Sequence, residues 1–409
     1  MLLRTVWRPH RSDDATASAL DLPASRDSSN ADDAGATSVA VWCGDRTPPE
    51  WIPLLPVYAL RETSQSENLS SWSMIDWKLL AREQIVLSDI VVFLQAGLVA
   101  RQAASELIHW VFDTDAVTTN DEVDIHQRRL ALVRGSFEED HQLSHLTRQI
   151  RSVRRFSVWE DHETAVARAM LLDGLCSPWS SWKRLSVRVF EAITRLRHSD
   201  VRPSALWYAN PVFQRSPAST LLTEKGVVPW PAFSRFFDYG LQLGVIISKE
   251  TRNVTSEEAI ESIGAFVVFI EYTARDIVLE ERHGSHFGVS KSVGIVGSLS
   301  ATVATSDEVL PHINNLNAVV RLNGVPVASG NTRGMRHSFG EMISYASCGE
   351  TLLPGDLLCT WKLVCESLKT IRYSNTDAVF LCQAQERYPG HPALKLADVW
   401  GTLLSHPMS

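Results

Sequence analysis

The chain has 409 residues, of which 44% are apolar and 21% are charged, and its formal net charge is −8. A chain of this length can bury one large core or two separate ones, and its acidic balance argues against a nucleic-acid-binding surface. We therefore expect a soluble protein without a nucleic-acid partner.

The first 38 residues are predicted to form a disordered tail, because the segment from residue 9 onward is rich in Ser, Ala and Asp. The stretch from Met1 to Val6 lacks the long apolar core of a secretory signal. A mitochondrial presequence is poor in acidic residues, whereas this segment contains Asp13, Asp14, Asp21 and Asp27. The sequence therefore favours a cytoplasmic location over a mitochondrial one.

Residues 39–176 are assigned to an amino-terminal domain and its connecting segment. The helical spacing of apolar residues predicts helices over Ser105–Phe112 and Glu163–Leu172. The longest apolar segment, Ile85–Ala100, contains an aspartate and a glutamine and is too short and too polar to span a bilayer comfortably. We interpret it as a buried helix or strand, and we expect no membrane partner.

The six cysteines are scattered and form no Cys-x-x-Cys pair, which argues against a zinc site or a redox motif. Reduced thiols are the default for an intracellular protein. Cys359 has no activating base nearby in the sequence, which argues against a nucleophilic role for its thiol.

Two apolar segments in the second half of the chain predict strands. Phe237–Ile247 mixes alternation with an apolar run, as expected for a strand with one end in a site. Ala265–Ile270 has the length and β-branched content of a buried strand, and the charged residues Glu271, Arg275 and Asp276 follow it. Charged groups at the end of a buried strand either pair with each other or act on a ligand.

Local signals in the same region predict where short helices begin. Thr255 with Glu258 forms a capping box, which opens a helix that we expect to reach Ile263. Ser338 with Glu341 forms a second capping box of the same kind.

The dipeptide Asn323-Gly324 lies between two apolar stretches and predicts a two-residue β-hairpin. Together with the predicted strands and short helices, this hairpin indicates a β-rich α+β fold. We assign residues 177–409 to the domain that contains these elements.

Several segments, in the same order, resemble the fumarylacetoacetate hydrolase (FAH) superfamily over roughly Pro178 to Leu381. The charged strand end Gly264–Asp276 is similar to that family's Gly-Phe-(apolar)-Asn-Asp-x-(Ser/Thr)-Ala-Arg-Asp run, with Glu271 in place of its metal-binding aspartate. Further similar segments are Leu206–Phe213, Phe237–Ile247, Phe287–Lys291, Met335–Met342 and Leu353–Leu358. The resemblance implies an FAH-type carboxy-terminal domain, a β-roll of mixed sheets with short helices, beside a smaller amino-terminal domain. It also implies a homodimer.

The resemblance further implies a divalent cation, Mg²⁺, Ca²⁺ or Mn²⁺, which needs several carboxylate oxygens. In this sequence the family's ligand positions fall at Val189, Gly240, Gln242 and Glu271, so one carboxylate and one amide remain. Such a set does not replace three or four anionic ligands for a hard cation. We therefore expect no cofactor and no metal site.

The polar residues that remain make up the site that the resemblance implies. The predicted catalytic residues are Glu271, Lys291, Lys362 and Arg275. The predicted substrate-binding residues are Thr360, Gln242, Gln214 and Asp276. Lysine charges can hold an enolate or a carboxylate near a general base. In an alternative reading, Arg275 and Asp276 form a buried ion pair that only locks the strand end.

Two classes of function follow from these residues. The first is a metal-independent, FAH-type enzyme that isomerises, decarboxylates, cyclises or cleaves an enolisable di- or polycarbonyl compound, in specialised (secondary) metabolism. The second is a non-catalytic relative, a pseudoenzyme, that binds a carbonyl or carboxylate ligand or pairs with an active homologue. Loss of the family's metal ligands favours the second class, whereas the retained Lys and Arg positions favour the first, which we prefer.

Overall fold

A computed structural model describes the fold for most of the chain. The described residues are 1–9, 35–43, 50–55, 57–58, 89–112, 145–172, 180–222, 226–228, 231–234, 237–284, 288–322, 325–360, 378–386 and 394–403.

Within these residues, ten strands form one sheet in the order β3-β2-β1-β10-β9-β8-β13-β4-β5, with β6 paired to β10. Neighbouring strands in this sheet are antiparallel except for β13 with β4 and β10 with β6. The strands are β1 (Leu2–Pro9), β2 (Gly35–Cys43), β3 (Glu50–Pro53), β4 (Ser152–Phe156), β5 (Phe213–Ser216), β6 (Leu221–Leu222), β8 (Phe237–Ile247), β9 (Ile263–Ala274), β10 (Val296–Thr305) and β13 (Asp356–Thr360).

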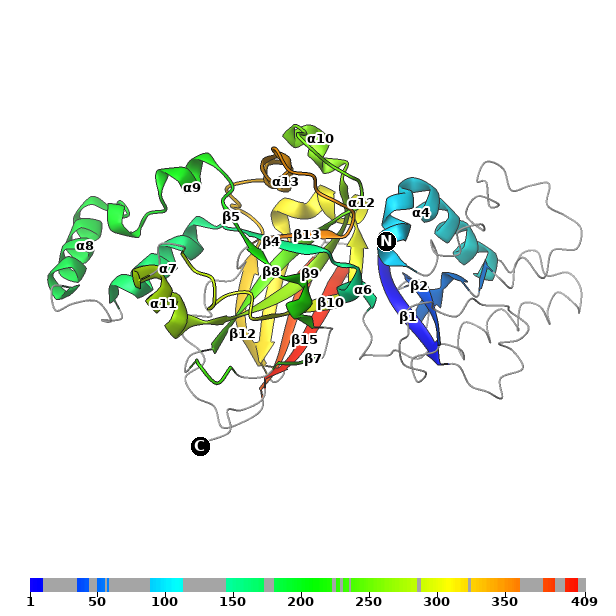
Figure 1. The fold of residues 1–409 in the computed structure, drawn as a ribbon, viewed down its shortest axis with the longest axis horizontal. Coiled ribbons are helices and arrows are strands. Elements are labelled where there is room, and N and C mark those ends of the chain that lie inside the picture. The colour runs from blue at the N-terminus through cyan, green and yellow to red at the C-terminus, as the bar shows by residue number, and fades with distance from the viewer. Residues whose placement is uncertain are drawn as a thin grey trace, which may run out of the picture.

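A second sheet of five described strands has the order β12-β11-β14-β15-β7. Its strands are β7 (Gly226–Val228), β11 (Asn317–Leu322), β12 (Val325–Asn331), β14 (Ala378–Glu386) and β15 (Leu394–Leu403). The helices around the two sheets are α4 (Ile90–Phe112), α6 (His145–Gln149), α7 (Glu160–Leu172), α8 (Ser180–Thr194), α9 (Ala205–Ala209), α10 (Ser256–Ile260), α11 (Arg275–Gly284), α12 (Ser306–Val309) and α13 (Phe339–Ser347). Figure 1 shows α4 beside β1 and β2 at one end of the molecule, and α8 at the other.

The large sheet is buried on both faces. Successive residues of a strand point to opposite sides, and in this sheet they enter two different cores. Leu241 and Val268 belong to a core that also includes residues of β11 and α13. Val267 and Phe269 belong to a second core, shared with β1–β3 and α4. This arrangement explains why β8 and β9 read as nearly continuous apolar runs rather than as alternating ones. The observed architecture confirms the predicted β-rich α+β fold with short helices.

The local predictions in this region are confirmed, with small shifts in helix length. Both capping boxes are present, at Thr255 and at Ser338. The helix after Thr255 ends at Ile260 rather than at the predicted Ile263, because Ile263 already pairs in β9. Leu322 lies opposite Val325 in the antiparallel pair β11–β12, as the hairpin prediction requires, although Asn323 and Gly324 themselves lie outside the described residues.

The predicted tail over residues 1–38 is wrong at both ends, because Leu2–Pro9 forms β1 and β2 begins at Gly35. This strand pairs with β2 on one side and with β10 on the other, and Leu3 is buried in the core. The amino group of Met1 lies 3.1 Å from the Glu308 carboxylate. One partner of β1 is β10, which lies about 300 residues further along the sequence, with Leu2 opposite Ala304. The composition around residues 2–9 therefore does not reveal this pairing. Residues 10–34 lie outside the described residues.

Helix α4 corresponds to the long apolar segment of the sequence. By length and composition alone it is the one helix among the described residues that is suited to cross a membrane. Phe93, Leu94 and Leu107 are buried against the β1–β3 side of the large sheet. Those contacts are the ones a core helix makes in a globular fold.

Candidate functional site

Glu271 lies inside the large sheet, near the end of β9, and its side chain is 1% exposed. Gly240 of β8 lies directly opposite it, and Gln242 is two residues further along β8 on the same face. The Gln242 amide donates a hydrogen bond of 2.7 Å to one Glu271 carboxylate oxygen. The backbone N–H of Gly294 donates one of 3.3 Å to the other oxygen. The structure therefore brings together two of the predicted site residues, Glu271 and Gln242.

The principal partner of Glu271 is Arg155, which the sequence analysis missed. Arg155 lies on β4, and its guanidinium forms an ion pair with the Glu271 carboxylate inside the sheet, where both side chains are 1% exposed. Burial lowers the pKa of Arg155 to about 10, so the guanidinium stays cationic at neutral pH. A buried charge of either sign needs such a partner.

The sequence of β4 explains how Arg155 reaches this position. Ser152-Val-Arg-Arg-Phe156 contains two adjacent arginines, and adjacent residues of a strand point to opposite faces. Arg154 pairs with Glu350 at 2.5 Å and with Asp356 at 3.3 Å. The sequence signal for these ion pairs was therefore two adjacent arginines in a short strand with apolar neighbours. A buried arginine needs a carboxylate partner, so this pattern predicts two buried ion pairs.

A pocket of about 210 Å³, including the space at its mouth, opens beside this ion pair. Arg155, Glu271 and Gly294 line it on one side, and Ser216 and Thr220 add hydroxyl groups. The Ser216 hydroxyl is buried and has no hydrogen-bond partner among the described residues. The pocket is therefore lined by a paired cation and carboxylate, with the Ser216 hydroxyl as a further polar group.

Gly294 is required at this pocket for two reasons. Its φ angle is 66°, in the left-handed region that favours glycine. A Cβ atom there would lie 2.8 Å from the Ser216 hydroxyl oxygen and 3.5 Å from an Arg155 guanidinium nitrogen. The glycine thus brings its N–H to Glu271 and leaves the pocket open.

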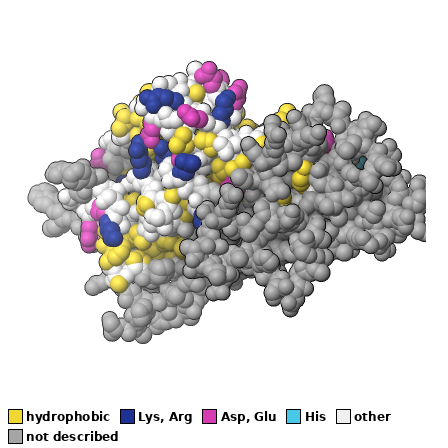
Figure 2. Space-filling view, turned by 45° about the vertical axis from the view of Figure 1, so that its right-hand side comes forward, with side chains coloured by type: hydrophobic (Ala, Val, Ile, Leu, Met, Phe, Trp, Pro, Cys, Tyr) yellow, Lys and Arg dark blue, Asp and Glu magenta, His cyan; other side chains and the backbone are white. Residues whose placement is uncertain are grey.

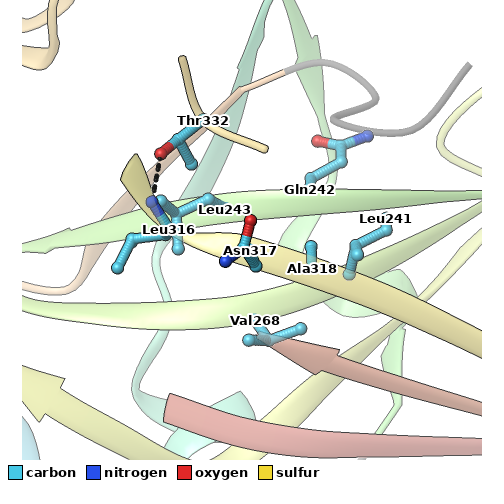
Figure 3. A pocket seen from close by; sticks show the side chains of 8 residues that line it. All are labelled: Leu241, Gln242, Leu243, Val268, Leu316, Asn317, Ala318 and Thr332. Atoms are coloured by element: carbon cyan, nitrogen blue, oxygen red, sulfur yellow. Dashed lines mark hydrogen bonds between the residues drawn. The ribbon is translucent and has the colours of Figure 1, made fainter. Parts of the chain in front are cut away.

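A second pocket, of about 250 Å³, lies between β8, β9 and β11 and is shown in Figure 3. Its walls include Leu241, Val268 and Ala318, and it has no charged lining residue in the described part of the chain. The Thr332 hydroxyl at its edge accepts a hydrogen bond of 2.8 Å from the Leu316 N–H, and the Gln242 side chain points away from Ala318. This space offers little chemistry beyond apolar contact.

The predicted pairing of Arg275 with Asp276 is wrong. The Arg275 guanidinium instead pairs with Asp238 of β8, with 2.7 Å between nitrogen and oxygen. Asp276 accepts a hydrogen bond of 2.7 Å from the Ser234 hydroxyl. Arg275, the first residue of α11, therefore ties the start of that helix to β8, a pairing that no local sequence pattern indicates.

Lys291 occupies the surface and is not among the described residues that line the pocket. Its ammonium group lies 5.1 Å from the centre of the Phe233 ring, a cation–π contact. Its backbone N–H donates to the Glu281 carboxylate at 2.6 Å, and Ser292 donates to the same group. These hydrogen bonds outweigh the effect of burial and lower the pKa of Glu281.

Of the remaining predicted residues, the substrate-binding Thr360 and Gln214 make structural hydrogen bonds, and the predicted catalytic Lys362 lies outside the described part. The Thr360 hydroxyl accepts a hydrogen bond of 3.1 Å from the Leu243 N–H. The Gln214 amide donates to the carbonyl oxygen of Val289. Lys362 lies outside the described residues.

Cys359 lies on β13, opposite Arg155 of β4 and Gly244 of β8. Its thiol is fully buried, and burial raises its pKa even though the Arg155 charge acts in the opposite direction. The thiol therefore stays protonated at neutral pH, which argues against a nucleophilic role.

Comparisons with known proteins match the second half of the chain. The family model described as "Fumarylacetoacetate (FAA) hydrolase C-terminal" matches residues 191–365. An uncharacterized protein of Pyrococcus abyssi is 31% identical over 151 residues, which cover 37% of this chain and 66% of that protein. The mitochondrial oxaloacetate tautomerase FAHD1 of Homo sapiens is 29% identical over 153 residues, which cover 37% of this chain and 68% of that protein. The chain thus spans just under two thirds of the Pyrococcus protein's length.

Among solved structures, the fumarylpyruvate hydrolase of Pseudomonas aeruginosa, in complex with Mn²⁺ and pyruvate, matches with a TM-score of 0.42 and 15% identity. The match covers 63% of this chain and 91% of that one. The sequence-based expectation that no cofactor is used is contradicted, because that fumarylpyruvate hydrolase is solved with Mn²⁺.

The residues at Glu271 do not fit a divalent cation in the arrangement seen here. The Glu271 carboxylate is engaged by Arg155 and Gln242, which donate protons where a cation would need oxygen ligands. No group of three His, Cys, Asp or Glu side chains with metal-binding spacing occurs in the described residues. Val189, which was mapped to the first ligand position, lies exposed on α8, so the structure does not place it beside Glu271.

Proposed function

Because this chain belongs to the fumarylacetoacetate hydrolase superfamily, we propose that it is an enzyme that interconverts the keto and enol forms of a small dicarbonyl acid. The observation that carries this proposal is the buried pair of Arg155 and Glu271 on the wall of a small polar pocket. Tautomerisation needs a base for a carbon-bound proton and a donor for the developing enolate oxygen. The pocket offers one group of each kind.

The chemical roles follow from the charges in the pocket. The Glu271 carboxylate takes the proton from the carbon next to the carbonyl group, so that a C–H bond breaks and an enolate forms. The Arg155 guanidinium has five N–H donors, so it can hold the enolate oxygen while it still contacts Glu271. Return of the proton from Glu271 to that oxygen forms the O–H bond of the enol. The reaction is an isomerisation and consumes no second substrate.

The small volume of the pocket sets the substrate class. The empty space of about 210 Å³ includes open solvent at the mouth of the pocket, so the substrate that we propose is a short-chain keto acid and not a polymer or a large ring system. A substrate carboxylate finds a second anchor in the Ser216 hydroxyl, which has no partner in the described structure. Oxaloacetate, the compound named for the human relative, is the first substrate to test.

The test follows the loss of enol absorbance of oxaloacetate with purified protein and with supplied Mg²⁺ or Mn²⁺. Glu271→Gln keeps the size of the side chain and removes the base, so turnover should fall by roughly 10²–10⁴-fold. Arg155→Gln should reduce turnover by roughly 10²-fold or more. Arg154→Gln is the matched control, because Arg154 is an equally charged neighbour on β4 that pairs with Glu350 and Asp356 instead.

The result also separates the two classes of function. Equal turnover in Glu271→Gln and in the wild type would overturn the assigned role of the carboxylate. A protein that turns over no keto acid, but binds oxaloacetate in calorimetry and loses that binding in Arg155→Gln, would be the non-catalytic ligand-binding relative. A fall in Arg154→Gln as large as in Arg155→Gln would show that general loss of folding causes the effect.

A further inference from the structure

Helix α8 turns its apolar side to the solvent. Trp182 and Ile193 are 74% and 77% exposed, which is far more than large apolar side chains show in a core helix. The complete exposed stripe consists of Trp182, Leu185, Val189, Phe190, Ile193 and the following Leu196. Four of these residues, Trp182, Leu185, Val189 and Ile193, follow one another at intervals of three or four residues, so they lie along one face of the helix.

Among the described side chains of α8, Val187 is the buried one. At 100° per residue it lies well away from Trp182, Leu185, Val189 and Ile193. Beyond the carboxy-terminal end of the helix, Arg197 donates to Glu160 at 2.9 Å and to Asp161 at 2.5 Å, both at the start of α7. The helix is therefore fixed to the body through Val187 and through Arg197 beyond its end, and Arg188 stays exposed. Figure 1 shows it at the extremity of the molecule, away from both sheets.

The charge of α8 is opposite to that of the whole chain. The helix sequence contains three basic residues, Lys183, Arg184 and Arg188, against one acidic residue, Glu191, whereas the chain has a net charge of −8. Arg195 follows directly after the helix. Elsewhere, on the face that Figure 2 shows, basic and acidic side chains are interspersed. The apolar stripe is thus combined with a local excess of positive charge.

From this combination we propose that α8 binds an anionic membrane surface, with its apolar stripe in the headgroup region and its basic residues on the lipid phosphates. Helices with a Trp, Phe and Leu face, a basic polar side and low average hydrophobicity lie in the membrane interface in this way. Each Lys or Arg near an anionic leaflet adds to the attraction.

A second copy of the chain fits this face less well. A second copy of α8 would bring the same net positive charge, which repels its own kind, whereas an anionic leaflet attracts it. An amphipathic helix at the edge of the molecule can also lie flat on a bilayer. The membrane is therefore the occupant to test first.

The experiment is co-sedimentation of the full chain with phosphatidylcholine vesicles, with and without phosphatidylserine. The wild type should bind the anionic vesicles at least about 10-fold more tightly than the neutral ones, and added salt should weaken this binding. Ile193→Asp and Arg188→Glu should each reduce binding by about 10-fold or more. Val325→Asp is the matched control, because Val325 is an apolar residue on β12 that is 62% exposed.

Circular dichroism of each variant shows whether it is folded, so that a loss of binding is assigned to the surface. Three outcomes would overturn the proposal: binding to neither vesicle type, equal binding to both, or an equal loss in Val325→Asp. Light scattering that shows a dimer in the wild type and a monomer in Ile193→Asp, without vesicle binding, would overturn it in favour of self-association.

Discussion

The Arg155–Glu271 pair and helix α8 contrast in how they place charged and apolar groups. The large sheet buries a full ion pair in which each side chain is 1% exposed. Helix α8 does the reverse, because its apolar side chains point outward while Arg197 beyond its end bonds to the body. Both arrangements are unfavourable for the chain alone in water, because burial removes hydration from charged groups and exposure leaves apolar groups in contact with water. Buried charges of this kind are common at functional sites, and exposed apolar patches are common where a partner binds.

The two regions differ in what a substitution should reveal. A change in the buried pair alters folding and ligand chemistry together, because each charge depends on the other. A change on α8 alters only the surface, because the substituted side chains make few contacts within the chain. Stability measurements on matched variants therefore test whether the contrast is real.

The largest effect is expected for Arg155→Leu. This change leaves the Glu271 carboxylate buried without its cation, which should lower the free energy of unfolding by about 3–5 kcal/mol. Urea denaturation measures the loss. The double variant Arg155→Leu/Glu271→Leu should recover most of it, because an apolar pair of similar size needs no partner charge.

The control for this prediction is Arg197→Leu. Arg197 pairs with Glu160 and Asp161, but its side chain is 37% exposed, so solvent screens the pair. We expect a loss of no more than about 1 kcal/mol. If Arg155→Leu costs as little as Arg197→Leu, the Arg155–Glu271 pair is not buried in solution as the structure describes.

An intermediate loss of stability is expected for Gly294→Ala. Comparison with a control glycine separates the cost of the positive φ from the cost of crowding at the pocket. Gly294→Ala forces an L side chain into a φ of 66° and places its Cβ atom 2.8 Å from the Ser216 hydroxyl, so we expect a loss of about 1–3 kcal/mol. Gly349→Ala is the matched control, because its φ is 72° and a Cβ atom there would meet no atom within 4 Å. Thermal unfolding should show the larger loss for Gly294→Ala. Equal losses would mean that the space between Gly294 and Ser216 is not tight.

The elements that could be predicted from the sequence are those whose causes are local. The capping boxes at Thr255 and Ser338 are hydrogen bonds between residues three apart, so the sequence contains both partners within one turn. The bounds of β8 were also predicted without error, because its apolar pattern reports burial on both faces. The resemblance to a known family supplied the position of Glu271 in a site.

The parts that escaped prediction depend on partners distant in the sequence. Arg155 meets Glu271 only because β13 and β8 lie between β4 and β9 in the sheet, an order that no local pattern contains. Arg275 meets Asp238 for the same reason, through the pairing of β8 with β9. Val189, the residue mapped to the first ligand position, lies on the exposed helix α8 rather than in the sheet.

The smallest effect on stability is expected for Ile193→Asp on α8. Ile193 is 77% exposed, so the isoleucine gains little from burial in the folded chain and the aspartate loses little hydration. We expect the free energy of unfolding to change by no more than about 0.5 kcal/mol, measured by urea denaturation of the dilute protein. A loss above about 2 kcal/mol would show that α8 packs against the chain through this face, and the outward stripe would then not exist in solution. Unchanged stability together with lost vesicle binding would instead mean that the exposed stripe acts on a partner and not on the fold.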